Sequence, residues 1–141
     1  MKRFLLFLIS LLGFSMVGCD KPDPEPKPSS FVSAYGTPRA KFEVKGRVVD
    51  ENQQPLNHIQ ITAGHAENIV YTDSVGVYQI EAYAMTSLGI IATDIDGEAN
   101  GGEFEPATKL VEISREELQG GSGWELGDVT KEVNFELKRK E

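Results

Sequence analysis

Apolar and polar residues alternate in several stretches of this chain between positions 42 and 82. A period of two is the spacing of a β-strand with one buried face, because successive side chains point to opposite sides of a sheet. The apolar positions form four groups: Phe42, Val44, Gly46 and Val48; Ile59, Ile61 and Ala63; Ile69 to Tyr71; and Tyr78, Ile80 and Ala82. The pattern predicts strands arranged as two hairpin arms, residues 45–62 and 71–82.

Turn chemistry separates these groups. Residues 50–56 are mostly polar and include Pro55, which cannot donate to a ladder and suits a loop between strands. Residues 72–76 predict a tight turn, in which Gly76 adopts a positive φ and Asp73 offers a side-chain oxygen to the turn's amides.

The rest of the chain supplies further strands. Residues 87–95 are apolar at successive positions, which predicts a strand covered on both faces. Residues 109–113 predict a shorter strand, and Ser114 with Glu117 fits a capping box for one or two helical turns. The last strand is predicted from the alternation of Val133, Phe135 and Leu137 with polar residues.

This pattern resembles the carboxypeptidase regulatory-like domain. The resemblance rests on Gly46, Val48, Asp50, Pro55, Leu56, Ile59, Ile61, Thr72, Asp73, Gly76, Tyr78 and Ile80, with Gln54 where such domains carry Gly. It implies an all-β fold, a seven-stranded prealbumin-like (transthyretin-like) Greek-key β-sandwich. Such domains are usually binding or accessory modules, so the resemblance implies no enzyme.

The beginning of the chain predicts export and anchoring. Residues 1–18 have a basic start and an apolar run too short to span a bilayer comfortably, which is typical of a signal peptide. The run ends Met16-Val17-Gly18-Cys19, which resembles the bacterial lipobox, in which the Cys is lipidated and becomes the new N-terminus. Cys19 is the only Cys of the chain. We expect lipid anchoring at Cys19 in the bacterial cell envelope, at the outer membrane.

Residues 19–39 are expected to act as a tether. Residues 20–39 hold five of the seven prolines among charged and small residues, which favours an extended polyproline II segment. Phe31, Val32 and Tyr35 either pack on the edge of the domain or stay exposed. The domain itself is expected at residues 40–138, enough for one core, with residues 139–141 as a C-terminal tail.

Charge narrows the possible partners. The net charge is −8, and loss of Lys2 and Arg3 with the signal peptide makes it −10. An acidic chain whose one basic cluster is residues 138–140 gives no electrostatic case for nucleic acid.

One acidic segment has the ligand spacing of a calcium loop. Hard cations such as Ca²⁺ recruit oxygens at alternate positions, here Asp94, Asp96, Glu98, Asn100 and Glu105 at loop positions 1, 3, 5, 7 and 12. Position 6, where a Ca²⁺ loop needs Gly, is Ala99, and the segment before the loop is a strand. We therefore expect an acidic surface loop with Asp-Gly and Asn-Gly turns, and Ca²⁺ is the alternative.

A second resemblance covers nearly the whole chain. The lipobox, the Pro-rich segment, residues 35–38 with Phe42, Val44 and Gly46, and the residues Asp94, Asp96, Gly97, Asn100, Gly101, Gly102 and Phe104 resemble the Bacteroidetes lipoproteins encoded beside a radical S-adenosylmethionine (SAM) protein. This resemblance implies a lipoprotein of unknown biochemical role with a radical SAM protein as a partner.

Catalytic patterns are weak. His58 and His65 have no Cys to complete a zinc site, and no nucleophile motif marks Ser74 or Ser87. We expect a non-catalytic binding or assembly module for an envelope protein or glycan. The alternative is a maturation substrate of a radical SAM enzyme, modified at an aromatic residue such as Tyr35 or Trp124.

Overall fold

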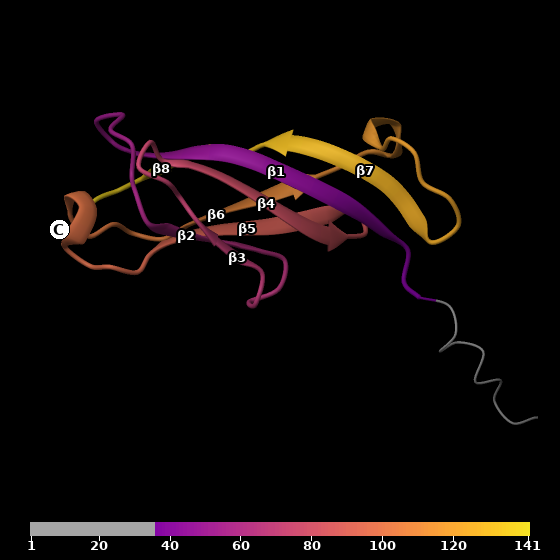
Figure 1. Ribbon diagram of the computed structural model, residues 1–141, viewed down its shortest axis with the longest axis horizontal. Helices are drawn as coiled ribbons and strands as arrows, with labels where there is room; N and C mark the ends of the chain where they lie inside the picture. The colour runs from indigo at the N-terminus through magenta and orange to yellow at the C-terminus, as the bar shows by residue number, and fades with distance from the viewer. Residues whose placement is uncertain (1–35) are drawn as a thin grey trace, which may run out of the picture. The chain divides into compact units, whose positions relative to one another are not determined.

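The alternation becomes eight strands in the computed structural model, which describes residues 36–141 (Figure 1). The strands are β1 (Arg39–Asp50), β2 (Ile59–Ala63), β3 (Ile69–Tyr71), β4 (Val77–Ala84), β5 (Ser87–Asp94), β6 (Ala107–Glu112), β7 (Glu125–Glu132) and β8 (Phe135–Leu137). Two 3-10 turns, η2 (Ala99–Gly101) and η3 (Arg115–Glu117), are the helical elements of this part of the chain. The predicted capping box is present at η3, where the Ser114 amide donates to Glu117 Oε2 at 2.8 Å.

The strands form two four-stranded sheets that make a β-sandwich. One sheet has the order β4-β1-β7, with β8 also beside β1, and the other has the order β3-β2-β5-β6. β1 is antiparallel to β4 and parallel to both β7 and β8. β7 and β8 pair with successive parts of the same edge of β1, so together they occupy one strand position. The two sheets confirm the prediction of an all-β sandwich.

The core lies between the sheets and follows the predicted alternation. In β1 the side chains of Phe42, Val44 and Val48 are buried. Phe135 and Leu137 of β8 are buried as well, whereas Glu136 between them is exposed. The largest fully buried side chains are Phe42, Phe135, Ile61, Leu88, Ile90, Leu137, Val44 and Val48.

The predicted hairpin arms are wrong. β1 pairs with β4, β7 and β8, whereas β2 pairs with β3 and β5, so the loop containing Pro55 crosses from one sheet to the other. The turn at residues 72–76 also crosses, because β3 and β4 belong to different sheets. Alternation shows which face of a strand is buried but not which strand it pairs with. A loop that crosses between sheets also uses the same turn residues as a hairpin, so the sequence could not distinguish the two.

The predicted chemistry of the second crossing is confirmed. Asp73 Oδ1 accepts hydrogen bonds from the amides of Val75 at 3.0 Å and Val77 at 2.9 Å, and Gly76 has φ 75°. Buried Thr72 joins this crossing to the first one. Its hydroxyl accepts from the amide of Ile59 at 2.9 Å and donates to the carbonyl of Leu56 at 2.7 Å.

The junction between β7 and β8 passes close to β1 at Gly46. The Val133 carbonyl accepts a 2.6 Å hydrogen bond from the Tyr78 hydroxyl, and the Val133 amide donates to the Lys45 carbonyl at 2.8 Å. A Cβ placed on Gly46 would lie 1.8 Å from the Val133 oxygen. Gly46 is therefore required for close approach of two backbones.

β5 is covered on one face and not on both, so that prediction is wrong. Leu88, Ile90 and Ala92 are buried between the sheets. Ile91, on the other face, is 40% exposed. A strand of consecutive apolar residues is buried on both faces only where another element packs on its second face. Within residues 36–141, no element packs on the second face of β5.

The ends of the chain differ from expectation in one respect. Residues 139 and 140 are not a free tail, since the Lys140 amide donates to the Glu103 carbonyl at 2.9 Å and Arg139 bridges to Phe104.

Cys19, the signal peptide and residues 19–35 of the tether lie outside the described residues. Within residues 36–141, no helix has the length and apolar character needed to cross a bilayer.

Candidate binding site

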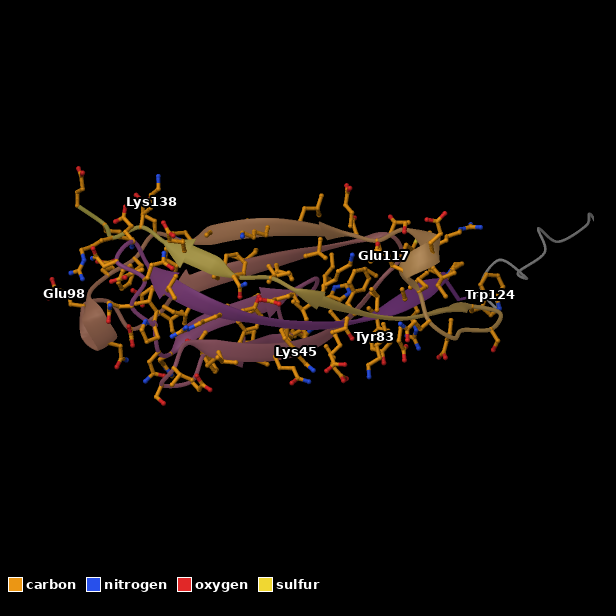
Figure 2. All side chains as sticks on the ribbon, turned by 90° about the horizontal axis from the view of Figure 1, so that it is seen from above. Lys45, Tyr83, Glu98, Glu117, Trp124 and Lys138 are labelled. Atoms are coloured by element: carbon orange, nitrogen blue, oxygen red, sulfur yellow. The ribbon has the colours of Figure 1, made fainter. Side chains whose placement is uncertain are left out.

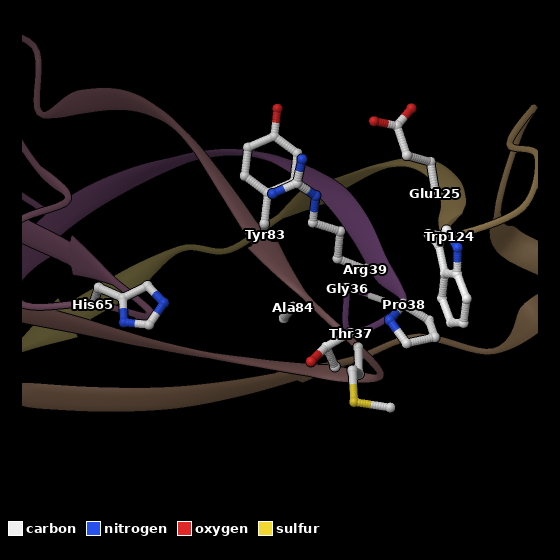
Figure 3. A pocket seen from close by; sticks show the side chains of 10 residues that line it. Gly36, Thr37, Pro38, Arg39, His65, Tyr83, Ala84, Trp124 and Glu125 are labelled. Atoms are coloured by element: carbon white, nitrogen blue, oxygen red, sulfur yellow. The ribbon is translucent and has the colours of Figure 1, made fainter. Parts of the chain in front are cut away.

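An open pocket of about 740 Å³ lies at the end of the domain where β1 begins (Figure 3). Four segments line it: the start of β1, the end of β4, the turn after β2 and the Gly-rich turn before β7. The lining includes Pro38, Arg39, His65, Tyr83, Met85, Trp124 and Glu125. Figure 2 places this end, marked by Trp124, opposite the end that carries Glu98 and Lys138.

The Gly-rich turn delivers Trp124 to β1. Gln119 and Asp128 form a bridge across its base, and the Arg39 amide donates to the Trp124 carbonyl at 3.0 Å. Gly121 and Gly127 both have positive φ, and a Cβ on either would lie under 3 Å from backbone atoms. The segment therefore reverses the chain before β7.

Tyr83 reaches the pocket because it occupies an outward position near the end of β4, after Gln79 and Glu81. The guanidinium of Arg39 lies over its ring, 4.8 Å from the centroid. Such a cation–π contact holds the guanidinium near the ring, while the N–H donors at the edge of the guanidinium stay available for acceptors.

The pocket brings exposed aromatic side chains together with a positive charge. Tyr83 is 52% exposed and Trp124 is 48% exposed, so two large aromatic side chains present apolar area at one place. Arg39 adds a positive charge, and His65 adds ring nitrogens. This combination fits a ligand that offers both an apolar ring face and hydrogen-bond acceptors.

Sequence reasoning found only part of this site. Trp124 was singled out as an aromatic residue open to modification, but Arg39, Tyr83 and Met85 were not identified. The available signal was Tyr83, a large aromatic residue at the polar phase of the alternation in β4. The four segments that line the pocket meet because of the order of the strands in the sheets, and the alternation does not encode that order.

The acidic loop lies at the opposite end, and its side chains are used to shape it. Asp94 Oδ1 accepts from the Asp96 amide at 3.2 Å, and Asp94 Oδ2 accepts from the Phe104 amide at 2.9 Å. The Asn100 side-chain amide donates to Asp96. Both oxygens of the first expected ligand therefore already hold backbone amides.

The carboxylates of this loop are either exposed or already accept hydrogen bonds and ion pairs from the protein. Burial raises the pKa of Asp94, and the nearby Asp96 carboxylate acts in the same direction. Glu98 and Glu105 are exposed, while Glu103, which was not among the expected ligands, pairs with Lys140. No three His, Cys, Asp or Glu side chains between residues 36 and 141 are grouped so that they could hold a metal ion. Calcium binding here stays a prediction, and the geometry gives it no support.

The two histidines lie apart from one another on the surface. His58 stacks on Tyr71 with ring centroids 5.0 Å apart, and His65 lines the pocket. Both are exposed.

No protein-family model and no curated protein matches this chain. Among solved structures, the chain is similar to 3-chlorocatechol 1,2-dioxygenase from Rhodococcus opacus 1CP, with a TM-score of 0.43 and 11% sequence identity over 71% of this chain. The chain spans 60% of the length of that dioxygenase. Nothing about activity follows from a similarity at this level.

Proposed function

We propose that this chain is a lipid-anchored protein of the bacterial cell envelope whose β-sandwich is a non-catalytic binding module. The anchor is Cys19, the only Cys, at the end of a signal-like segment. Two or more acyl chains hold a protein on a membrane durably, since each buried methylene contributes about 0.8 kcal/mol.

The observation that carries the binding role is the pocket at the start of β1. It gathers Tyr83, Trp124 and Met85, all about half exposed, around the Arg39 guanidinium. Exposed aromatic residues next to a fixed positive charge favour recognition of a ligand with ring faces and acceptors, such as an envelope glycan or a protein segment.

Intrinsic fluorescence tests the pocket directly, because Trp124 is the only Trp of the chain. We expect soluble peptidoglycan fragments, or a peptide carrying an aromatic residue and carboxylates, to shift the Trp124 emission in a saturable way. Tyr83→Ala should weaken that binding at least tenfold. Tyr71→Ala is the matched control, since Tyr71 lies on the other sheet and is 47% exposed, close to the 52% of Tyr83. Equal effects of the two substitutions would exclude the pocket as the site.

Fractionation tests the anchor. The full chain should be found with membranes, and Cys19→Ala should block incorporation of labelled fatty acid. Incorporation of the label into the Cys19→Ala protein would contradict the lipoprotein assignment without touching the binding role.

A second candidate function is that of a maturation substrate for a radical SAM enzyme. The observation that favours it is the exposure of Trp124 on the Gly-rich turn, where a second protein can reach the indole. Tyr35, the other expected target, lies outside the described residues. The intact mass of the chain, produced with and without the radical SAM protein that this candidate role requires, distinguishes this role from plain binding.

A further inference from the structure

Arg39 carries a positive charge that the domain leaves without an ionic partner. Four lysines among residues 36–141 form ion pairs with glutamates: Lys41, Lys45, Lys131 and Lys140. No carboxylate of the same part of the chain pairs with Arg39, whose guanidinium lies over the Tyr83 ring. In a chain with 22 acidic and 14 basic residues, an arginine held in this way keeps its N–H donors for an acceptor from outside the domain.

Glu125 is the carboxylate best placed to have neutralised Arg39. It begins β7 and is the register partner of Arg39 in the parallel ladder. Both residues line the pocket, yet the guanidinium is directed to Tyr83 on β4 and not to Glu125 (Figure 3). The pocket therefore holds one positive and one negative group that do not form a pair. A ligand with one negative charge can bind Arg39, whereas a second negative charge would be repelled by Glu125.

The sheet edges beside the pocket are already occupied, which argues against an extended peptide. β4 is the edge strand of its sheet, and the Asn68 side-chain amide donates to its Glu81 carbonyl at 2.7 Å. On the β7 side, Gln119 and Asp128 exchange two backbone hydrogen bonds of 2.9 Å. A peptide that adds to a sheet gains its affinity from backbone bonds to a free edge. Recognition at this end of the domain therefore depends on the side chains of the pocket.

We propose that the pocket binds an acidic sugar of a glycan, with the carboxylate on Arg39 and the sugar ring on Trp124. This inference rests on the proposed binding function of the same pocket and names its ligand class. A carboxylate matches the forked N–H donors of a guanidinium, and the half-exposed Trp124 offers a flat apolar surface for the C–H face of a sugar. Tyr83 is a positioning residue, because its ring holds the guanidinium. A phosphorylated sugar, with about two negative charges at pH 7, is disfavoured by Glu125.

Titration of the full chain, extracted from membranes in a neutral detergent, tests the ligand class through the Trp124 emission. The first probe is a hyaluronan tetrasaccharide, in which a uronic acid alternates with a neutral sugar. The second is the disaccharide of N-acetylglucosamine and N-acetylmuramic acid, whose carboxylate lies on a side arm and not directly on the ring. Each probe is compared with its own form in which the carboxylate is reduced to an alcohol. At least one acidic probe should bind about tenfold more tightly than its reduced form, as expected for a hydrogen bond between charged groups, and that probe identifies the source of the sugar.

Three substitutions assign the effect to the two charges of the pocket. Arg39→Gln should remove the preference for the acidic probe, and Glu125→Gln should increase it severalfold. Arg47→Gln is the matched control, since it removes the same charge from another exposed, outward residue of β1. Arg47 lies about 26 Å along the strand from Arg39, well beyond the screening length of about 8 Å at physiological salt. This control should leave the preference unchanged.

Equal binding of the acidic and reduced forms would overturn the inference, as would a preference that survives Arg39→Gln or that Arg47→Gln removes equally. Absence of binding by both acidic probes would overturn it as well. The proposed binding function is judged separately. It survives if a reduced probe, or the peptide with an aromatic residue and carboxylates, still shifts the Trp124 emission in a saturable way, and it fails if none of these ligands does so.

Discussion

Gly46→Ala should be the most destabilising single-methyl change in the domain, because its Cβ has no space. The new Cβ would lie 1.8 Å from the Val133 oxygen and 2.9 Å from a ring carbon of Tyr78. Real Cβ atoms essentially never approach other atoms closer than 3.0 Å, so the carbonyl must retreat by about 1.2 Å.

The cost follows from the bonds that this retreat breaks. The Val133 carbonyl holds the Tyr78 hydroxyl at 2.6 Å, and the Val133 amide holds the Lys45 carbonyl at 2.8 Å. Each lost hydrogen bond costs about 1 kcal/mol net, and overpacking adds about 1 to 3 kcal/mol. We expect a loss of about 3 to 5 kcal/mol in the free energy of unfolding, which at roughly 4 to 8 °C per kcal/mol lowers Tm by more than about 12 °C.

Urea and thermal unfolding followed by circular dichroism measure this loss. Gly89→Ala is the matched control, since it also adds a methyl to a strand glycine, and nothing lies within 4 Å of the new Cβ. It should leave Tm nearly unchanged. Tyr78→Phe removes only the hydroxyl and should cost a fraction of the Gly46→Ala loss. If Gly46→Ala and Gly89→Ala unfold at the same temperature, the backbone contact at Val133 is not present in the protein.

Three further predictions concern the core, the surface charges and the acidic loop. Phe135→Ala should cost about 3 to 5 kcal/mol while Glu136→Ala leaves stability nearly unchanged, so equal melting temperatures would contradict the alternation of β8. The hydrogen bond from Lys131 lowers the pKa of Glu117 below its ordinary value of 4.5. The stability that this pair contributes is therefore present above pH 4.5 and is lost as the pH falls through the lowered pKa. Glu117→Gln should be less stable than the parent at pH 7 and equal to it in acid. Ca²⁺ and Mg²⁺ at equal concentration should shift Tm equally. A bound Ca²⁺ would instead raise the free energy of unfolding by about 2.7 kcal/mol at a hundredfold excess over Kd. A rise of this kind that is selective for Ca²⁺ and is abolished by Asp96→Asn would show a metal site.

The sequence predicted burial well and strand partners poorly. Phe42, Val44 and Phe135 are buried as expected, and Asp73 caps its turn as expected, because side-chain periodicity and turn chemistry are local properties. The pairing of β1 with β7 and β8 joins residues from opposite ends of the domain, so no local pattern reports it. For the same reason the crossing at Pro55 was mistaken for a hairpin.

The candidate site was only partly predictable, because it depends on that same topology. Trp124 was singled out as an aromatic residue open to modification, but its neighbours Arg39 and Tyr83 are ordinary strand residues until β4 and the Gly-rich turn meet β1. In the acidic loop, the spacing matched a calcium site while the backbone used Asp94 to hold its own amides. Spacing alone does not reveal which acceptors a loop consumes internally.

The parallel pairing of β1 with β7 and β8 has a consequence for how the domain is made. A ribosome releases β1 first and β7 and β8 after every other strand of the two sheets, so β1 stays without its second neighbour until those strands have been made. Contacts between distant parts of a chain form slowly, because the loop between them must close first. The sheet containing β1 therefore cannot be completed before β7 is made, and a chain cut short before Glu125 leaves one edge of β1 open to pairing with other chains.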